Sequence, residues 1–115
     1  VELLRRTLTA SAEPITLISL APLTNIALLL RTHPEVRDRI ARVVMMGGAV
    51  GTGNATAAAE LNVWHDPEAA AIVLGEGLDV LMYGLEPFYR VSVTHADVAR
   101  LRAADNPAPQ LAGAL

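Results

Sequence analysis

Three short apolar runs constrain the fold of this 115-residue sequence more than any other feature. They span residues 15–20, 43–46 and 79–85, and their composition predicts buried strands. Segments with a helical spacing of apolar residues precede, separate and follow the runs. Strands that are apolar on both faces and alternate with helices are typical of a parallel sheet covered by helices. We therefore predict one α/β domain over residues 1–115, with a mostly parallel, open, Rossmann-like sheet flanked by helices.

Proline, glycine and capping residues predict where the helices begin and end. A first helix should end before Glu13-Pro14, because the residue before a proline disfavours helical backbone. Asp66 followed by Pro67 is a strong start signal, and Thr94 with Asp97 has the spacing of a capping box. The other helices are expected over residues 23–31, 34–39, from Asp66 to Gly75 or Gly77, and from Thr94 to about Asn106.

Composition excludes several classes of protein. The sequence has no cysteine, so it can hold neither a disulfide nor a zinc site made of thiolates. Its formal net charge is -3 and its arginines are dispersed, which argues against nucleic-acid binding. No apolar stretch reaches the roughly 20 residues that a membrane span requires. We expect a soluble, cytoplasmic protein that binds neither nucleic acid nor a membrane.

A polar set follows the second predicted strand. Asn54, Glu60 and Asn62 lie in or just after a loop of small residues that begins at Gly47-Gly48. Ligands of open α/β sheets bind beyond the carboxyl ends of the strands, and sugar hydroxyls need both donors and acceptors. The same residues could instead cap backbone groups in a turn-rich loop, and their spacing alone favours that interpretation.

Other catalytic motifs are absent. The glycines from Gly47 to Gly53 do not fit the dinucleotide-binding pattern, and no lysine follows them as in a phosphate-binding loop. No G-x-S-x-G segment marks a serine nucleophile. The three histidines lie in different predicted elements and lack the spacing of metal ligands.

Several segments resemble the inosine-uridine preferring nucleoside hydrolases. Residues 21–28, APLTNIAL, resemble the GPLTNIAL segment of that family, and residues 44–48, VMMGG, resemble its strand ending in MGG. Asn54, residues 59–62 (AELN) and residues 66–70 (DPEAA) resemble the family pattern N…AEFN…DPEAA in identity and spacing. The resemblance covers almost the whole chain. It implies that this chain is the central part of a larger nucleoside hydrolase fold.

The resemblance also implies a function. Members of the family use a bound calcium ion to hydrolyse the N-glycosidic bond of ribonucleosides. By resemblance, Asn54 and Glu60 would face the 5′-hydroxyl side of the ribose, Asn62 would bind ring hydroxyls near the metal, and Met46 would pack against the sugar. The backbone carbonyl of Leu20 would be a calcium ligand, which suits a hard cation. We expect a ribonucleoside as the small-molecule partner and a homo-oligomeric parent protein.

The chain departs from the family pattern in two respects. Ala21 replaces a usual glycine and Leu61 replaces a usual phenylalanine. The acidic cluster D-x-D-x-x-x-D-D and the later His-Asp pair of the family have no counterpart in these residues. We therefore expect the isolated chain to be inactive. A ribose-binding module without catalysis, or a structural remnant that lacks the metal site, is the alternative to a nucleoside hydrolase.

Overall fold

Three parallel strands form the centre of the fold. The computed structural model describes all 115 residues, and its sheet has the strand order β1 (Ile15–Ser19), β2 (Ile40–Met46), β3 (Val80–Tyr83). Ser19 lies opposite Met45, which in turn lies opposite Met82. The carboxyl ends of all three strands therefore meet at one edge of the sheet, as expected for parallel strands joined by crossover connections. The predicted α/β class is confirmed.

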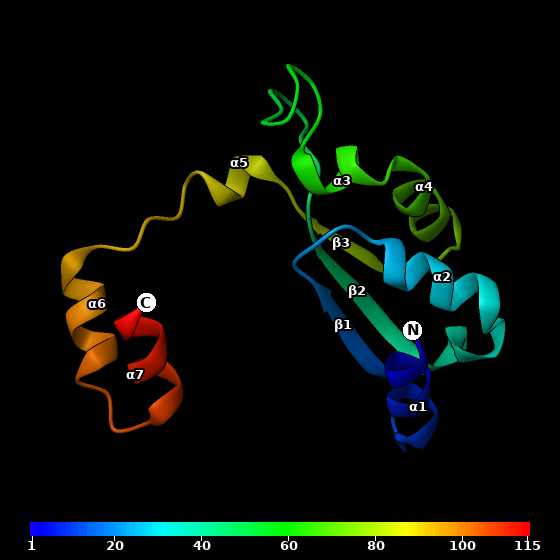
Figure 1. The fold of residues 1–115 in the computed structure, drawn as a ribbon, viewed down its shortest axis with the longest axis horizontal. Coiled ribbons are helices and arrows are strands. Elements are labelled where there is room, and N and C mark those ends of the chain that lie inside the picture. Colours follow the sequence, from blue (N-terminus) through cyan, green and yellow to red (C-terminus); the bar gives the residue numbers. More distant parts are fainter.

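The helices pack on one side of this sheet (Figure 1). They are α1 (Glu2–Ala10), α2 (Thr24–Thr32), the 3-10 helix η1 (Pro34–Arg39) and α4 (Pro67–Gly75). Their apolar side chains form one core cluster with the covered face of the strands, in which Leu8, Leu29, Val36, Val43 and Val73 are fully buried. Burial of apolar surface is the dominant favourable contribution to folding, so this cluster holds α2 and α4 against β2.

The other face of the sheet is bare. Ile18, Val44 and Leu81 lie side by side across the three strands and point away from the core, because side chains alternate between faces along a strand. The side chains of Ile18 and Leu81 are 69% and 53% exposed. The expectation that the strands are buried on both faces is thus wrong for one face of these 115 residues, where no helix packs.

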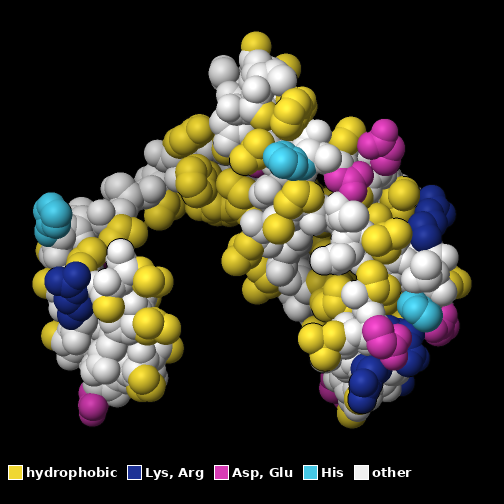
Figure 2. All heavy atoms as spheres, viewed as in Figure 1, with side chains coloured by type: hydrophobic (Ala, Val, Ile, Leu, Met, Phe, Trp, Pro, Cys, Tyr) yellow, Lys and Arg dark blue, Asp and Glu magenta, His cyan; other side chains and the backbone are white.

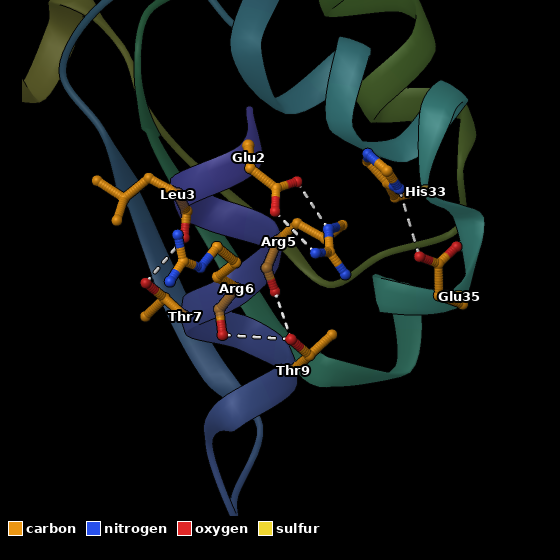
Figure 3. Close-up of polar contacts among 8 residues, drawn as sticks. All are labelled: Glu2, Leu3, Arg5, Arg6, Thr7, Thr9, His33 and Glu35. Carbon is orange, nitrogen blue, oxygen red and sulfur yellow. Dashed lines mark hydrogen bonds and ion pairs between the residues drawn. The ribbon is translucent and has the colours of Figure 1, made fainter.

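The first helix shows why packing rather than surface charge orients these helices. Figure 3 shows an ion pair between Glu2 and Arg5, with an oxygen-to-nitrogen distance of 2.7 Å, on the exposed side of α1. The hydroxyls of Thr7 and Thr9 donate to backbone carbonyls of the preceding turn. Exposed ion pairs contribute little to stability because solvent screens them. Leu8 is buried in the core cluster, and its burial fixes the face that α1 presents.

The last part of the chain stands apart from the sheet. After the short helix α5 (Leu85–Phe88), an extended segment leads to α6 (His95–Arg102) and α7 (Pro107–Ala114), which pack against each other. Figure 2 shows an open gap between this hairpin and the main body, with hydrophobic side chains along the connection. Tyr89, Val91 and Val93 are exposed there. None of the helices is long and apolar enough to cross a membrane.

Most predicted boundaries are confirmed, and three differ. The side chains of Asp66 and Thr94 cap α4 and α6, as predicted. Strand β2 begins at Ile40, three residues earlier than expected, and β3 ends at Tyr83 instead of Leu85 because α5 begins there. Helix α6 ends at Arg102 instead of near Asn106. Three helices were not predicted from the sequence: α3 (Leu61–His65), α5 and α7. Two of them, α3 and α5, are too short for apolar periodicity to be visible.

Candidate functional site

The ends of β1 and β2 bring two of the predicted site residues together. Leu20 follows the last residue of β1, and Met46 is the last residue of β2. Ser19 pairs with Met45 in the sheet. Leu20 and Met46 are the residues that follow this pair along the two strands, so they lie at neighbouring positions on the same edge of the sheet. The Leu20 side chain is 78% exposed and takes no part in the core.

Asn62 lies directly over the end of β2. Its side-chain nitrogen Nδ2 donates to the backbone carbonyl of Met46 at 3.0 Å and lies 3.4 Å from the Met46 sulfur. Its amide oxygen Oδ1 accepts no hydrogen bond from the protein. One half of the amide therefore fixes the side chain against the sheet, and the other half remains as a free acceptor at the sheet edge.

Glu60 is the most buried charged residue of the chain, with 2% of its surface exposed. It is the N-cap of α3, where its Oε1 accepts from the Asn62 backbone N–H at 2.9 Å and its Oε2 accepts from that of Val63 at 3.1 Å. The same Oε2 also accepts from the Gly48 N–H at 2.9 Å. A buried carboxylate needs such donors, and these three hold the start of α3 against the end of β2.

Asn54 stands in the loop of residues 47–59, which we call the β2–α3 loop. Its Oδ1 accepts from the Leu61 backbone N–H at 2.8 Å, and its Nδ2 donates to no protein atom. The backbone N–H groups of Asn54 and Ala55 donate to the Ala59 carbonyl, which folds the loop back on itself. The side chains of Asn54 and Glu60 thus make the backbone-capping contacts that their spacing favoured, and Asn54 keeps a free donor.

Glu86, which no sequence pattern predicted as a site residue, reaches the same loop from the turn after β3. Its Oε1 accepts from the backbone N–H groups of Val50 at 2.9 Å and Gly51 at 2.8 Å. The hydrogen bond from Gly51, followed by that from Glu86's own amide, keeps the pKa of the Glu86 carboxyl below its usual range. The only local feature of the sequence at Glu86 is its position two residues after the glycine that ends the strand. That feature does not indicate a hydrogen-bond partner 35 residues away.

A calcium site is not complete within these residues. Calcium takes six to eight oxygen ligands, many of them carboxylates. The chain contains no group of three or more His, Asp or Glu side chains that could hold a metal ion. Of the expected ligands it offers the Leu20 carbonyl at the sheet edge. The donor set of this segment alone therefore does not fit the ion.

Comparison with known proteins identifies the family. The sequence pattern that defines the inosine-uridine preferring nucleoside hydrolases matches residues 1–115. The chain belongs to this family. A pyrimidine-specific ribonucleoside hydrolase, RihA of Escherichia coli, is 53% identical over 107 residues, which cover 93% of this chain and 34% of RihA. The chain thus spans about a third of the length of the curated relatives that it matches.

Solved nucleoside hydrolases share the fold. A plant nucleoside hydrolase, PpNRh1, is 31% identical and has a TM-score of 0.81, with 97% of this chain and 36% of that one covered. A purine-preferring ribonucleoside hydrolase from Gardnerella vaginalis is 29% identical, has a TM-score of 0.82 and is covered to 36%. The α/β arrangement and the family predicted from the sequence are therefore both confirmed.

Proposed function

We propose that these 115 residues are the central part of a ribonucleoside N-ribohydrolase, which hydrolyses the N-glycosidic bond to give ribose and a free base. The observation that carries the proposal is the position of Asn62, whose Nδ2 is fixed to the Met46 carbonyl while its Oδ1 is free at the carboxyl edge of a parallel sheet. That edge is where open α/β sheets bind ligands. Membership of the nucleoside hydrolase family supports the substrate class.

The free polar groups suit a sugar. The hydroxyls of ribose donate and accept hydrogen bonds, and the free Asn62 Oδ1 is an acceptor while the free Asn54 Nδ2 is a donor. Cleavage of a glycosidic bond builds positive, oxocarbenium-like charge on the ribose. An oriented amide oxygen stabilises that charge more than it stabilises the neutral substrate, and such differential contacts raise the rate. Met46 offers an apolar surface beside this acceptor.

Glu60 has two roles in the proposal. Its carboxylate orders the start of α3, and with it the backbone of Asn62, through three hydrogen bonds. Its negative charge also lies near the sheet edge and would favour positive charge on a bound ribose. In the whole protein we propose that Ca²⁺ binds at this edge, with the Leu20 carbonyl as one ligand and further oxygen ligands from outside residues 1–115.

The test is steady-state hydrolysis by the full-length gene product, with uridine and inosine as substrates and with calcium either added or chelated. Ribose and free base should appear, and chelation should abolish the reaction. Absence of hydrolysis of both nucleosides in calcium would refute the proposal. Ribose binding without hydrolysis would favour the alternative, a non-catalytic binding module.

A further inference from the structure

The β2–α3 loop carries Asn54, and its base is held by the turn after β3. The Leu85 N–H donates to the Gly48 carbonyl at 3.0 Å. Oε1 of Glu86 accepts hydrogen bonds from the backbone N–H groups of both Val50 and Gly51, at 2.9 and 2.8 Å. These backbone groups have no strand partner, so the loop depends on a side chain from a different part of the chain for its position.

The rest of the loop is tied to itself. The Gly53 N–H donates to the Ala57 carbonyl, and Thr56 Oγ1 accepts from the Ala59 N–H at 3.0 Å. These bonds join the tip of the loop to the backbone around Asn54. Two contacts connect this part of the loop to its surroundings: the bond from the Leu61 N–H to Asn54 Oδ1 at the start of α3, and the bonds from Val50 and Gly51 to Glu86.

We propose that Glu86 is a positioning residue for substrate binding, whose carboxylate holds Val50 and Gly51 so that the β2–α3 loop presents Asn54 to the ribose. This inference rests on the proposed function and deepens it. Hydrogen bonds to a charged acceptor are stronger than neutral ones, which suits a contact that must hold an exposed loop. Small displacements of a substrate-positioning group can cost as much as a hundredfold in rate.

The first test does not need activity. In the full-length protein, amide hydrogen exchange of Val50 and Gly51 should be about tenfold or more faster in Glu86→Ala than in the natural protein. Glu86→Gln should stay close to the natural protein, because one amide oxygen can accept both bonds. Glu13→Ala, at an exposed acid whose side chain makes no hydrogen bond, is the matched control. Unchanged exchange in Glu86→Ala would overturn the proposal.

The second test is a double-mutant cycle on nucleoside hydrolysis. Glu86→Ala should lower kcat/KM by about 10- to 100-fold, mainly through KM, while Glu86→Gln restores most of it. In the Asn54→Ala background, Glu86→Ala should cost only a few-fold, because the two residues act through one loop. Additive effects, or Glu86→Gln as impaired as Glu86→Ala, would refute the positioning role.

Two outcomes separate this inference from the proposed function. If the natural protein hydrolyses no nucleoside while Glu86 still protects residues 50–51, the function fails and Glu86 keeps only a structural role, which refutes the positioning inference. If hydrolysis is normal and indifferent to Glu86→Ala, the inference fails and the function stands. Should Glu86→Ala not fold, Glu86→Asp, which withdraws the carboxylate by one methylene, takes its place with the same expected direction.

Discussion

Oε2 of Glu60 lies 2.9 Å from the backbone nitrogen of Gly48 and ties the end of β2 to the start of α3 across 12 residues of sequence. The contact leaves little room for a side chain between them, since a Cβ on Gly47 would come within 3.1 Å of the same oxygen. Gly48 itself has a φ of +81°, a conformation that glycine adopts without strain. The turn that leads from the sheet into the proposed site is therefore built around one buried carboxylate.

Replacement of Glu60 by glutamine should destabilise the full-length protein by about 1–3 kcal/mol. Three backbone N–H groups point at the carboxylate, and an amide can offer only one oxygen, so at least one buried donor loses its partner. Urea unfolding measures the change. Glu68→Gln, on the exposed side of α4, is the control and should change stability by less than about 0.5 kcal/mol. Equal effects at the two positions would contradict the capping role.

Alanine in place of Asn62 should lower kcat of the full-length protein by about a hundred- to a thousand-fold with uridine or inosine, the usual cost of losing one preorganised contact. Thr52→Ala is the control, since the Thr52 side chain is exposed and makes no hydrogen bond. Steady-state kinetics distinguishes the two. Turnover of Asn62→Ala within a few-fold of the natural protein would show that the site is wrongly assigned.

Substitution by alanine should have opposite effects at Gly53 and Gly75. A Cβ on Gly53 would overlap the backbone of Ala59, so Gly53→Ala must open the β2–α3 loop. A Cβ on Gly75, at the end of α4, meets nothing within 4 Å. We expect Gly75→Ala to leave the thermal midpoint unchanged or slightly raised, whereas Gly53→Ala weakens nucleoside binding. Equal KM values for the two variants would contradict the described loop geometry.

The contact between Asp66 and Thr24 should make the packing of α2 on α4 sensitive to acid. The hydroxyl of Thr24, followed by the Ala69 N–H, keeps the pKa of the Asp66 carboxyl below its usual value of about 3.9. A carboxyl with a lowered folded-state pKa contributes stability that is fully present above the unfolded-state pKa. That stability is lost as the pH falls through the folded-state value.

The stability difference between the natural protein and Asp66→Asn should therefore be present at pH 7 and shrink below about pH 4. Asparagine has one side-chain oxygen, so it can still accept from the Ala69 N–H. It has no second oxygen to accept the hydrogen bond from the Thr24 hydroxyl. Urea midpoints across this range provide the measurement, with Asp105→Asn, at an exposed residue whose side chain makes no hydrogen bond or ion pair, as the control. A difference that does not vary with pH would contradict the role of the charged carboxylate.

The 115-residue chain alone should associate in solution and show no nucleoside hydrolysis. Ile18 and Leu81 are exposed on the bare sheet face, and contiguous apolar surface favours association. Light scattering should find species larger than a monomer, and the pair Ile18→Thr and Leu81→Thr should shift the population towards monomer. A monomeric natural chain that unfolds cooperatively, or calcium-dependent hydrolysis by it, would contradict this expectation.

Local signals were sufficient for much of the fold and the family. The caps at Asp66 and Thr94 were readable because a capping side chain contacts a backbone group only three residues away. The segments around residues 21–28 and 59–62 were sufficient to identify the family, and three apolar runs predicted the parallel sheet. Local patterns could not predict α5, because its four residues are too few for helical periodicity to be visible.

Only the tertiary structure decided which polar groups at the site already have hydrogen-bond partners within the protein. Whether Glu60 or Asn54 meets a backbone donor depends on how the β2–α3 loop turns back on α3, and the spacing of these residues is compatible with either capping or ligand binding. Glu86 reaches Val50 across 36 positions because β3 lies beside β2, and no local pattern encodes that neighbour. The bare sheet face has the same origin: alternation along a strand assigns each side chain to a face, but burial of that face depends on where the helices pack.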